Sequence, residues 1–181
     1  MAYSLDQFCQ DCRDALAKDG GPGGRQAVRQ LLEKLLTNTA FVEEVCGDKA
    51  PQGVTTLYQD PDYEFVVLAH VNEKPHKSPP HDHGTSWAVY GQARQYTDMS
   101  EYRRLDGGEG DGEARLELVK SYRLNPGQAG TYDIRAIHAI DYPAGARFVR
   151  VTGRPLEHEP RLRFDTAANK AAFIENRSAS A

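Results

Sequence analysis

The sequence predicts a mainly β protein, a sandwich or barrel of short strands preceded by an N-terminal helical arm. Up to about residue 50, apolar residues recur at helical spacing. From residue 54 onward the chain changes to short runs rich in Val, Tyr, Phe and Thr, which turn sequences such as QDPD, NPGQ and PAGA separate. Many short strands at close spacing are typical of a β-sandwich or barrel.

Length and composition predict one domain over residues 1–181, divided into a helical arm (1–50), a β-barrel (54–154) and a C-terminal tail (155–181). The net charge of −4 argues against a nucleic-acid partner, which needs a clustered basic surface. No apolar run reaches the roughly 20 residues that span a bilayer, so we expect no membrane partner. The N-terminus lacks the pattern of a secretory signal, and we expect a cytoplasmic protein.

The helical arm is expected to contain three helices. The first covers residues 4–18, with Ser4 as its N-cap. The run GGPGG at 20–24 is expected to break the chain before a second helix at 25–36, and a short third helix follows at 38–47.

Three cysteines lie in this arm, and we expect them to be reduced, partly buried thiols. Cys9 and Cys12 have CxxC spacing, but they lie inside a helical pattern and no second such pair exists. A structural zinc site needs four ligands, and an odd cysteine count does not suit a disulfide framework.

Two segments beyond the arm carry weaker signals. The glycine-acid run at 107–112 lacks the ligand register of a calcium loop and is expected to be a solvated hairpin loop. In the tail, residues 166–175 are expected to form a short helix.

The stretch SPPHDHG contains two of the six histidines, His81 and His83. Residues i and i+2 of an extended segment point to one face, so both imidazoles can approach one ion while Asp82 points the other way. Catalytic metals usually have three protein ligands and an open position, so a third ligand is needed.

The third ligand must come from elsewhere in the chain, and the candidates are His70, His76, His138 and His158. His138 is favoured because it shares the otherwise apolar strand face of Ile134, Ala136 and Ile140. A core histidine bonded to a backbone carbonyl is the structural alternative, and His70 remains an alternative third ligand.

The sequences PPHDHGTSWAVYGQ and NPGQAGTYDIRAIHAI resemble the two metal motifs of the cupin superfamily, and most closely its thiol dioxygenase branch, which includes cysteine dioxygenase. The resemblance extends over residues 54–154. It implies a double-stranded β-helix (jelly-roll) barrel, a site of His81, His83 and His138, and iron(II) as the metal.

The chain departs from this pattern at the glutamate that most cupins carry four or five residues after the second histidine. Trp87 and Ala88 occupy those places, and Ala88 also replaces the cysteine that crosslinks in animal cysteine dioxygenases. Three neutral imidazoles leave a divalent ion its full charge, which suits an anionic substrate together with dioxygen. Zinc, nickel and other divalent metals suit such ligands as well.

A second departure lies on the last barrel strand, where a Ser-x-His-x-Tyr pattern is expected. Arg150, Thr152 and Arg154 take those places, and Thr56 lies nearest to the position of the arginine that binds the substrate carboxylate. These departures argue against cysteine as the substrate.

Further candidate site residues are Arg150 and Tyr142. Arg150 alternates with apolar residues and is a candidate to bind an anionic substrate inside the barrel; the alternative is an outward surface ion pair. Tyr142 is a candidate hydroxyl donor, as are Tyr90, Tyr102 and Tyr122, with ordinary barrel packing as the alternative. Trp87 is an even number of residues from His81 and His83, so in an extended strand it would point to the same side. It either lines the pocket of the metal site or packs in the core.

We therefore predict a mononuclear metal-dependent oxidoreductase, an iron(II) dioxygenase of a small anionic substrate that is a thiol or a related compound. Two alternatives stay open. One is a zinc or nickel cupin that acts as a Lewis acid in hydrolysis or isomerisation, and the other is a non-enzymatic ligand-binding cupin. A homodimer through a barrel edge is also open.

Overall fold

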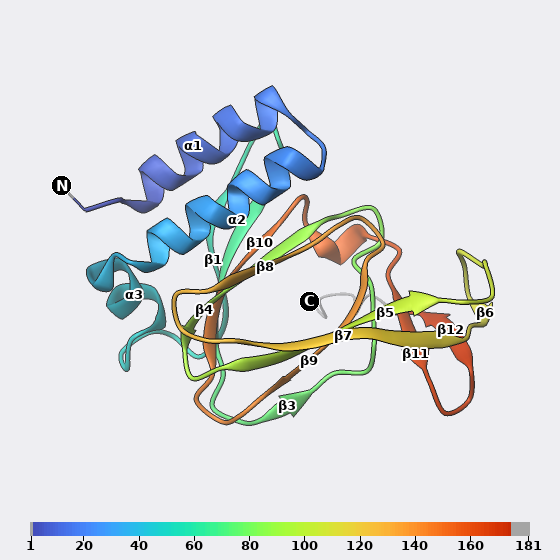
Figure 1. Ribbon diagram of the computed structural model, residues 1–181. Coiled ribbons are helices and arrows are strands. Elements are labelled where there is room, and N and C mark those ends of the chain that lie inside the picture. The colour runs from blue at the N-terminus through green and yellow to red at the C-terminus, as the bar shows by residue number, and fades with distance from the viewer. Residues whose placement is uncertain (1, 175–181) are drawn as a thin grey trace, which may run out of the picture.

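The computed structural model describes residues 2–174, apart from the side chain of His158, and shows three helices packed on a barrel of antiparallel strands (Figure 1). The helices come first in the chain: α1 (Leu5–Lys18), α2 (Pro22–Leu36) and α3 (Thr39–Cys46). A 3₁₀ turn, η1 (Leu156–His158), follows the barrel.

Two antiparallel sheets form the barrel. The five-stranded sheet contains, in spatial order, β1 (Gly53–Gln59), β2 (Val66–Val71), β10 (Arg147–Thr152), β4 (Ala88–Arg94) and β8 (Ala129–Tyr132). The four-stranded sheet contains β3 (His76–Lys77), β9 (Ile137–Tyr142), β5 (Thr97–Arg104) and β7 (Leu116–Leu124). The chain alternates between the sheets from β2 to β5 and again from β7 to β10, which is the jelly-roll arrangement. The predicted mainly β jelly-roll with an N-terminal helical arm is confirmed.

The tail forms strands where we expected a helix. β11 (Leu162–Asp165) and β12 (Lys170–Phe173) pair as an antiparallel hairpin, and β6 (Gly112–Glu113) joins them in a small third sheet. Within the range of the expected helix, residues 166–169 form the turn of this hairpin and residues 170–173 form β12. The predicted helix over 166–175 is therefore wrong for its described part, and residue 175 lies outside the described residues.

The helical arm begins as predicted but differs at its first break. The Oγ of Ser4 accepts a hydrogen bond from the amide of Gln7 at 3.2 Å and caps α1. The second helix starts at Pro22, inside the run expected to be a break. Proline suits the first helical turn because its missing N–H would have no helical partner there.

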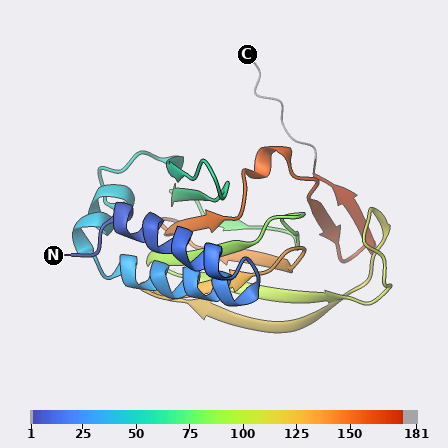
Figure 2. The same cartoon turned by 90° about the horizontal axis from the view of Figure 1, so that it is seen from above.

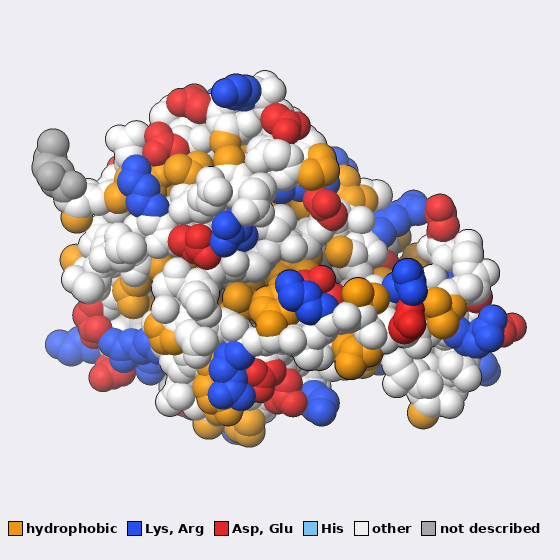
Figure 3. All heavy atoms as spheres, in the orientation of Figure 1, with side chains coloured by type: hydrophobic (Ala, Val, Ile, Leu, Met, Phe, Trp, Pro, Cys, Tyr) orange, Lys and Arg blue, Asp and Glu red, His pale blue; other side chains and the backbone are white. Residues whose placement is uncertain are grey.

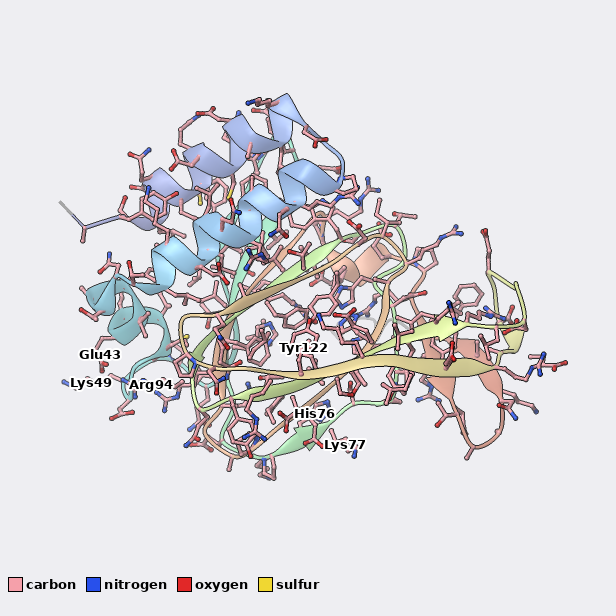
Figure 4. The ribbon with its side chains drawn as sticks, in the orientation of Figure 1. Glu43, Lys49, His76, Lys77, Arg94 and Tyr122 are labelled. Carbon is pink, nitrogen blue, oxygen red and sulfur yellow. The ribbon has the colours of Figure 1, made fainter. Side chains whose placement is uncertain are left out.

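The helices cover the outer face of the five-stranded sheet, with α2 and α3 against its strands and α1 against α2 (Figure 2). A Cβ atom placed on Gly91 of β4 would lie 2.7 Å from the Leu32 side chain and 2.8 Å from that of Leu36. Glycine at this position thus permits the close approach of α2. Figure 4 shows Arg94 at the end of β4 beside Glu43 of α3, with which it forms an ion pair.

The strands of the five-stranded sheet bury both faces, and the two faces differ in composition. The helix-facing side contributes Val67, Val89, Val149 and Val151 to one core cluster. The barrel interior is lined by larger and more polar side chains, among them Tyr90, Tyr132 and Phe148. Because side chains alternate along a strand, this division fixes which residues point into the barrel.

All three cysteines are free and buried, in agreement with the expectation of reduced thiols. Acidic and basic side chains are interspersed over the face shown in Figure 3. Within residues 2–174 no helix is both long and apolar enough to cross a bilayer.

Candidate metal centre

Backbone pairing brings His81 and His138 together. The amide of His81 donates to the carbonyl of His138 at 2.9 Å, and the amide of His138 donates back at 3.0 Å. Residues paired in this way across antiparallel segments place their side chains on the same face. His138 lies on β9, so the bridge carries the segment of His81 and His83 to the barrel interior.

The three imidazoles form a compact cluster. One potential ligand atom from each of His81, His83 and His138 lies within 4.8 Å of the others. The ring centroid of His138 lies 4.6 Å from that of His81 and 4.9 Å from that of His83. These three residues would hold one divalent ion, since histidine nitrogens are common ligands of such ions.

Hydrogen bonds fix the tautomers of two of the rings. Nδ1 of His81 lies 3.0 Å from the carbonyl oxygen of Pro79, and Nδ1 of His138 lies 3.2 Å from that of Ala136. A carbonyl oxygen only accepts, so both Nδ1 atoms carry the proton and both Nε2 atoms keep a lone pair. Nε2 of His138 is buried and has no hydrogen-bond partner within the described chain, which suits a metal ligand with its other nitrogen bonded to a carbonyl.

The surroundings keep the cluster uncharged. Burial lowers the pKa of His81, and it lowers the pKa of His83 well below its ordinary value. Burial, together with the smaller effect of a positive charge on His81, lowers the pKa of His138 to about 3. All three imidazoles are therefore neutral near pH 7, the state that binds a metal ion.

Two tyrosines surround the cluster. The hydroxyl of Tyr90 lies 3.3 Å from Nε2 of His83. The ring of Tyr132 stacks on His138 at 4.4 Å between centroids, and its hydroxyl is held 2.8 Å from that of Tyr122, which Figure 4 labels on β7. Of the tyrosines considered from the sequence, Tyr90 is the one whose hydroxyl contacts a histidine of the cluster.

Arg150 points into the barrel, since its neighbours Val149 and Val151 face the helices. Its Cζ lies 5.9 Å from the ring centroid of Tyr90, and its buried Nε has no hydrogen-bond partner within the described chain. The alternative of an outward surface ion pair is therefore wrong.

Tyr142 is not at the cluster. Its hydroxyl donates to Oδ1 of Asn72 at 3.1 Å, and its ring packs against Phe148 and against His76, which Figure 4 labels on β3. Four residues along β9 separate it from His138, a distance of roughly 13 Å. The structure thus gives no contact through which Tyr142 acts on the three histidines.

The other histidines lie apart from the cluster. His70 faces the interior but stacks on Phe148 at 4.5 Å and does not join the three ligand atoms. His76 is exposed on β3, and the side chain of His158 lies outside the described residues. Within the described chain, His138 is the third histidine of the cluster.

Trp87 packs in the core cluster under the helices, apart from the histidine cluster. Trp87 does not share the direction of the histidine pair because the chain turns at residues 84–85, where Gly84 has a φ of 62° and the amide of Ser86 donates to the carbonyl of His83 at 3.1 Å. Sequence reasoning also missed Arg161, which lies just before β11 and is close enough to affect the pKa of His83.

A large groove lies elsewhere on the described part of the chain. It lies on the face of the four-stranded sheet that is turned away from the barrel interior, next to the C-terminal hairpin. Its volume is about 1210 Å³. Its lining includes Ser100, Arg123 and Lys170 but none of the three clustered histidines.

No protein-family model matches the chain, and no curated protein matches it. Among solved structures, the chain is similar to the cupin domain of Cnp3 from Schizosaccharomyces pombe, with 6% identity and a TM-score of 0.42 over 56% of this chain and 60% of that one. It is also similar to the DMSP lyase DddQ from Ruegeria pomeroyi, with 12% identity and a TM-score of 0.42 over 60% of this chain and 49% of that one. A third is hydroquinone 1,2-dioxygenase PnpCD in complex with Cd²⁺ and 4-hydroxybenzonitrile, with 12% identity and a TM-score of 0.43 over 61% of this chain and 69% of that one. The chain thus spans less than two thirds of the first two of these proteins.

Proposed function

We propose that this protein is a mononuclear metal-dependent oxidoreductase, an iron(II) dioxygenase of a small anionic substrate, and that His81, His83 and His138 hold the ion. One observation carries the proposal. His138 donates its Nδ1 proton to a carbonyl, while its Nε2 is buried in the histidine cluster without a hydrogen-bond partner in residues 2–174. A buried polar atom without a partner is rare in folded proteins, and a metal ion satisfies this one.

The neutral ligand set supports an anionic substrate. No carboxylate belongs to the three-residue cluster, so a divalent ion held there keeps its full positive charge. Imidazole suits iron, zinc, nickel and copper, and the resemblance to the thiol dioxygenase branch is the reason to propose iron(II). A bound ion supplies polarisation of the substrate and, with iron, electron transfer involving dioxygen.

The chain's own residues account for the rest of the site. The hydroxyl of Tyr90 is placed to hold or donate a proton beside His83. The guanidinium of Arg150 lies on the same side of the barrel as Tyr90 and is placed to bind the negative charge of the substrate. Phe148 and Tyr132 wall this space with buried rings and exclude water from it.

Metal content and oxygen uptake test the proposal. The metal-free protein is loaded with iron(II), and we expect about one ion per chain, as for a single three-histidine site. Oxygen uptake is then followed with cysteine, 3-mercaptopropionate, cysteamine and a β-diketone. We expect uptake that depends on one of these substrates and is lost in His138→Ala, while His76→Ala, which removes an exposed histidine, behaves as the native protein.

Three other outcomes decide against parts of the proposal. Unchanged metal content in His138→Ala contradicts the site itself. Metal-dependent conversion of a substrate without oxygen consumption indicates the zinc or nickel Lewis-acid enzyme instead. Ligand-dependent stabilisation without turnover of any substrate indicates a binding protein.

A further inference from the structure

Two arginines near the histidine cluster form no ion pair with an acidic side chain of the described residues. Arg150 and Arg161 are each half-buried, and the Nε atom of each is buried without a hydrogen bond. Within the described residues, no carboxylate oxygen lies within 4.0 Å of either guanidinium, although Arg13, Arg104 and most other arginines have one. A partly buried charge without a counter-charge is costly, so this pair favours the binding of an anion.

The fold holds both arginines beside the same two histidines. Arg150 projects from β10 over the ring of Tyr90, whose hydroxyl contacts His83. Arg161 directly precedes Leu162, which is bonded to Asp82 in two ways. The amide of Leu162 donates to Oδ1 of Asp82 at 2.8 Å, and the carbonyl of Leu162 accepts from the amide of Asp82 at 3.0 Å. Asp82 stands between His81 and His83, so these two bonds tie the backbone next to Arg161 to the histidine pair.

The electrostatics agree with this placement. Burial lowers the pKa of Arg161 and the positive charge of Arg150 lowers it further, and these effects outweigh the opposite effects of Glu157, Tyr90 and Asp82. Burial is the main cause of the lowered pKa of His83. The positive charges of His138, Arg150, His81 and Arg161 lower the same pKa by smaller amounts. The nearest acid on the histidine segment, Asp82, is occupied by the amides of Gly84 and Leu162. The two guanidiniums therefore repel one another across a space that holds no protein anion within hydrogen-bond distance of them.

We propose that Arg150 and Arg161 together bind a dianionic oxyanion group, a phosphate, a phosphonate or a pair of carboxylates, on the substrate of the neighbouring three-histidine centre. Guanidinium forks match the oxygens of such groups and bind them through paired hydrogen bonds. Two fixed positive charges are balanced by a dianion, whereas a single carboxylate leaves one of them unneutralised. The identity of this group as part of a substrate rests on the proposed function, but the anion site itself does not need the metal.

Binding of simple anions to the metal-free protein tests the inference without any turnover. Isothermal titration with inorganic phosphate, succinate and acetate is performed at one ionic strength, because screening alters charge interactions. We expect phosphate or succinate to bind at least about tenfold more tightly than acetate, a difference of about 1.4 kcal/mol. Which of the two dianions binds more tightly distinguishes a phosphate-bearing substrate from a dicarboxylate.

Variants assign the binding to the two arginines. We expect Arg150→Gln and Arg161→Gln each to weaken dianion binding by about tenfold or more. Arg103→Gln is the matched control, since it removes one positive charge from an exposed arginine that pairs with Glu117 on β7. If a glutamine variant fails to fold, Arg161→Lys keeps the charge but loses the fork, and weaker binding in it supports the inference equally.

The outcomes separate this inference from the proposed function. Dianion binding that needs both arginines in a protein that takes up no metal supports the anion site and contradicts the metalloenzyme. Normal metal content with dianion binding equal in native protein and both glutamine variants overturns the anion site alone. Acetate binding as tight as phosphate and succinate binding also overturns it.

Discussion

Acid is expected to destabilise the metal-free protein through its buried histidines, and His138 permits a quantitative prediction. Burial lowers the pKa of His138 from 6.5 to about 3. Below pH 6.5 the imidazole takes up a proton in the unfolded chain but stays neutral in the folded one, so the unfolded state binds more protons. The contribution of neutral His138 to the free energy of unfolding is fully present above the unfolded pKa and is lost as the pH falls from 6.5 toward 3.

The size of the effect follows from the pKa difference. Each pH unit in this window lowers the free energy of unfolding by about 1.36 kcal/mol for one such group. At pH 5, about 1.5 units below the unfolded pKa, His138 alone accounts for a loss of about 2 kcal/mol. His70 and His83, whose pKa values burial also lowers well below 6.5, steepen the same fall.

Urea unfolding with a chelator at a series of pH values from about 7.5 to about 5 measures this fall. We expect the loss of stability over that range to be smaller by about 2 kcal/mol in His138→Gln than in the native protein. His76→Gln is the control, because His76 is exposed on β3, and its curve should follow that of the native protein. A His138→Gln protein with the native pH dependence would refute the reasoning, since it would mean that His138 is not held neutral by burial.

Further predictions concern packing, the site and the thiols. Gly91→Ala places a methyl group against the leucines of α2 and should lower the free energy of unfolding by about 1–3 kcal/mol in urea denaturation, whereas Gly110→Ala, with nothing within 4 Å of the new atom, should change it little. A stable Gly91→Ala protein would contradict the close approach of α2. Tyr90→Phe should leave metal content unchanged but slow oxygen uptake by about 100-fold if its hydroxyl transfers a proton, and an unchanged rate would reduce Tyr90 to a packing role. The native thiols should react with a disulfide reagent only on unfolding, because burial raises the pKa of each, to about 12 for Cys9 and about 11 for Cys46; rapid reaction without denaturant would contradict this.

Local patterns predicted most of the fold. The cap at Ser4, the helical spacing of the arm and the change to short strands near residue 54 all depend on neighbouring residues and agree with the structure. The expected helix in the tail failed because residues 170–173 form β12, a strand of only four residues, whose pairing with β11 and β6 decided the outcome. Short segments of this kind take their conformation from their partners.

The site was predictable in part. His81 and His83 stand two residues apart, so a shared direction follows from backbone geometry alone. The apolar face around His138 indicated that this histidine points inward, which the structure shows. Tyr142 has the same parity on β9 and also points inward, yet its hydroxyl bonds to Asn72, because parity gives the direction of a side chain and not its position along the barrel.

By itself, then, the sequence determined the helical arm, the barrel and the histidine pair, and it favoured the inward side of its strand for His138, since these follow from periods of a few residues; the direction of Arg150 stayed open until the structure placed it inside the barrel. Only the tertiary structure decided which distant groups meet. The backbone bridge between His81 and His138 selected the third histidine, and the bonds between Asp82 and Leu162 brought Arg161 to the same site. The physical reason is that strand register across the barrel depends on the packing of the whole chain, which no local pattern contains.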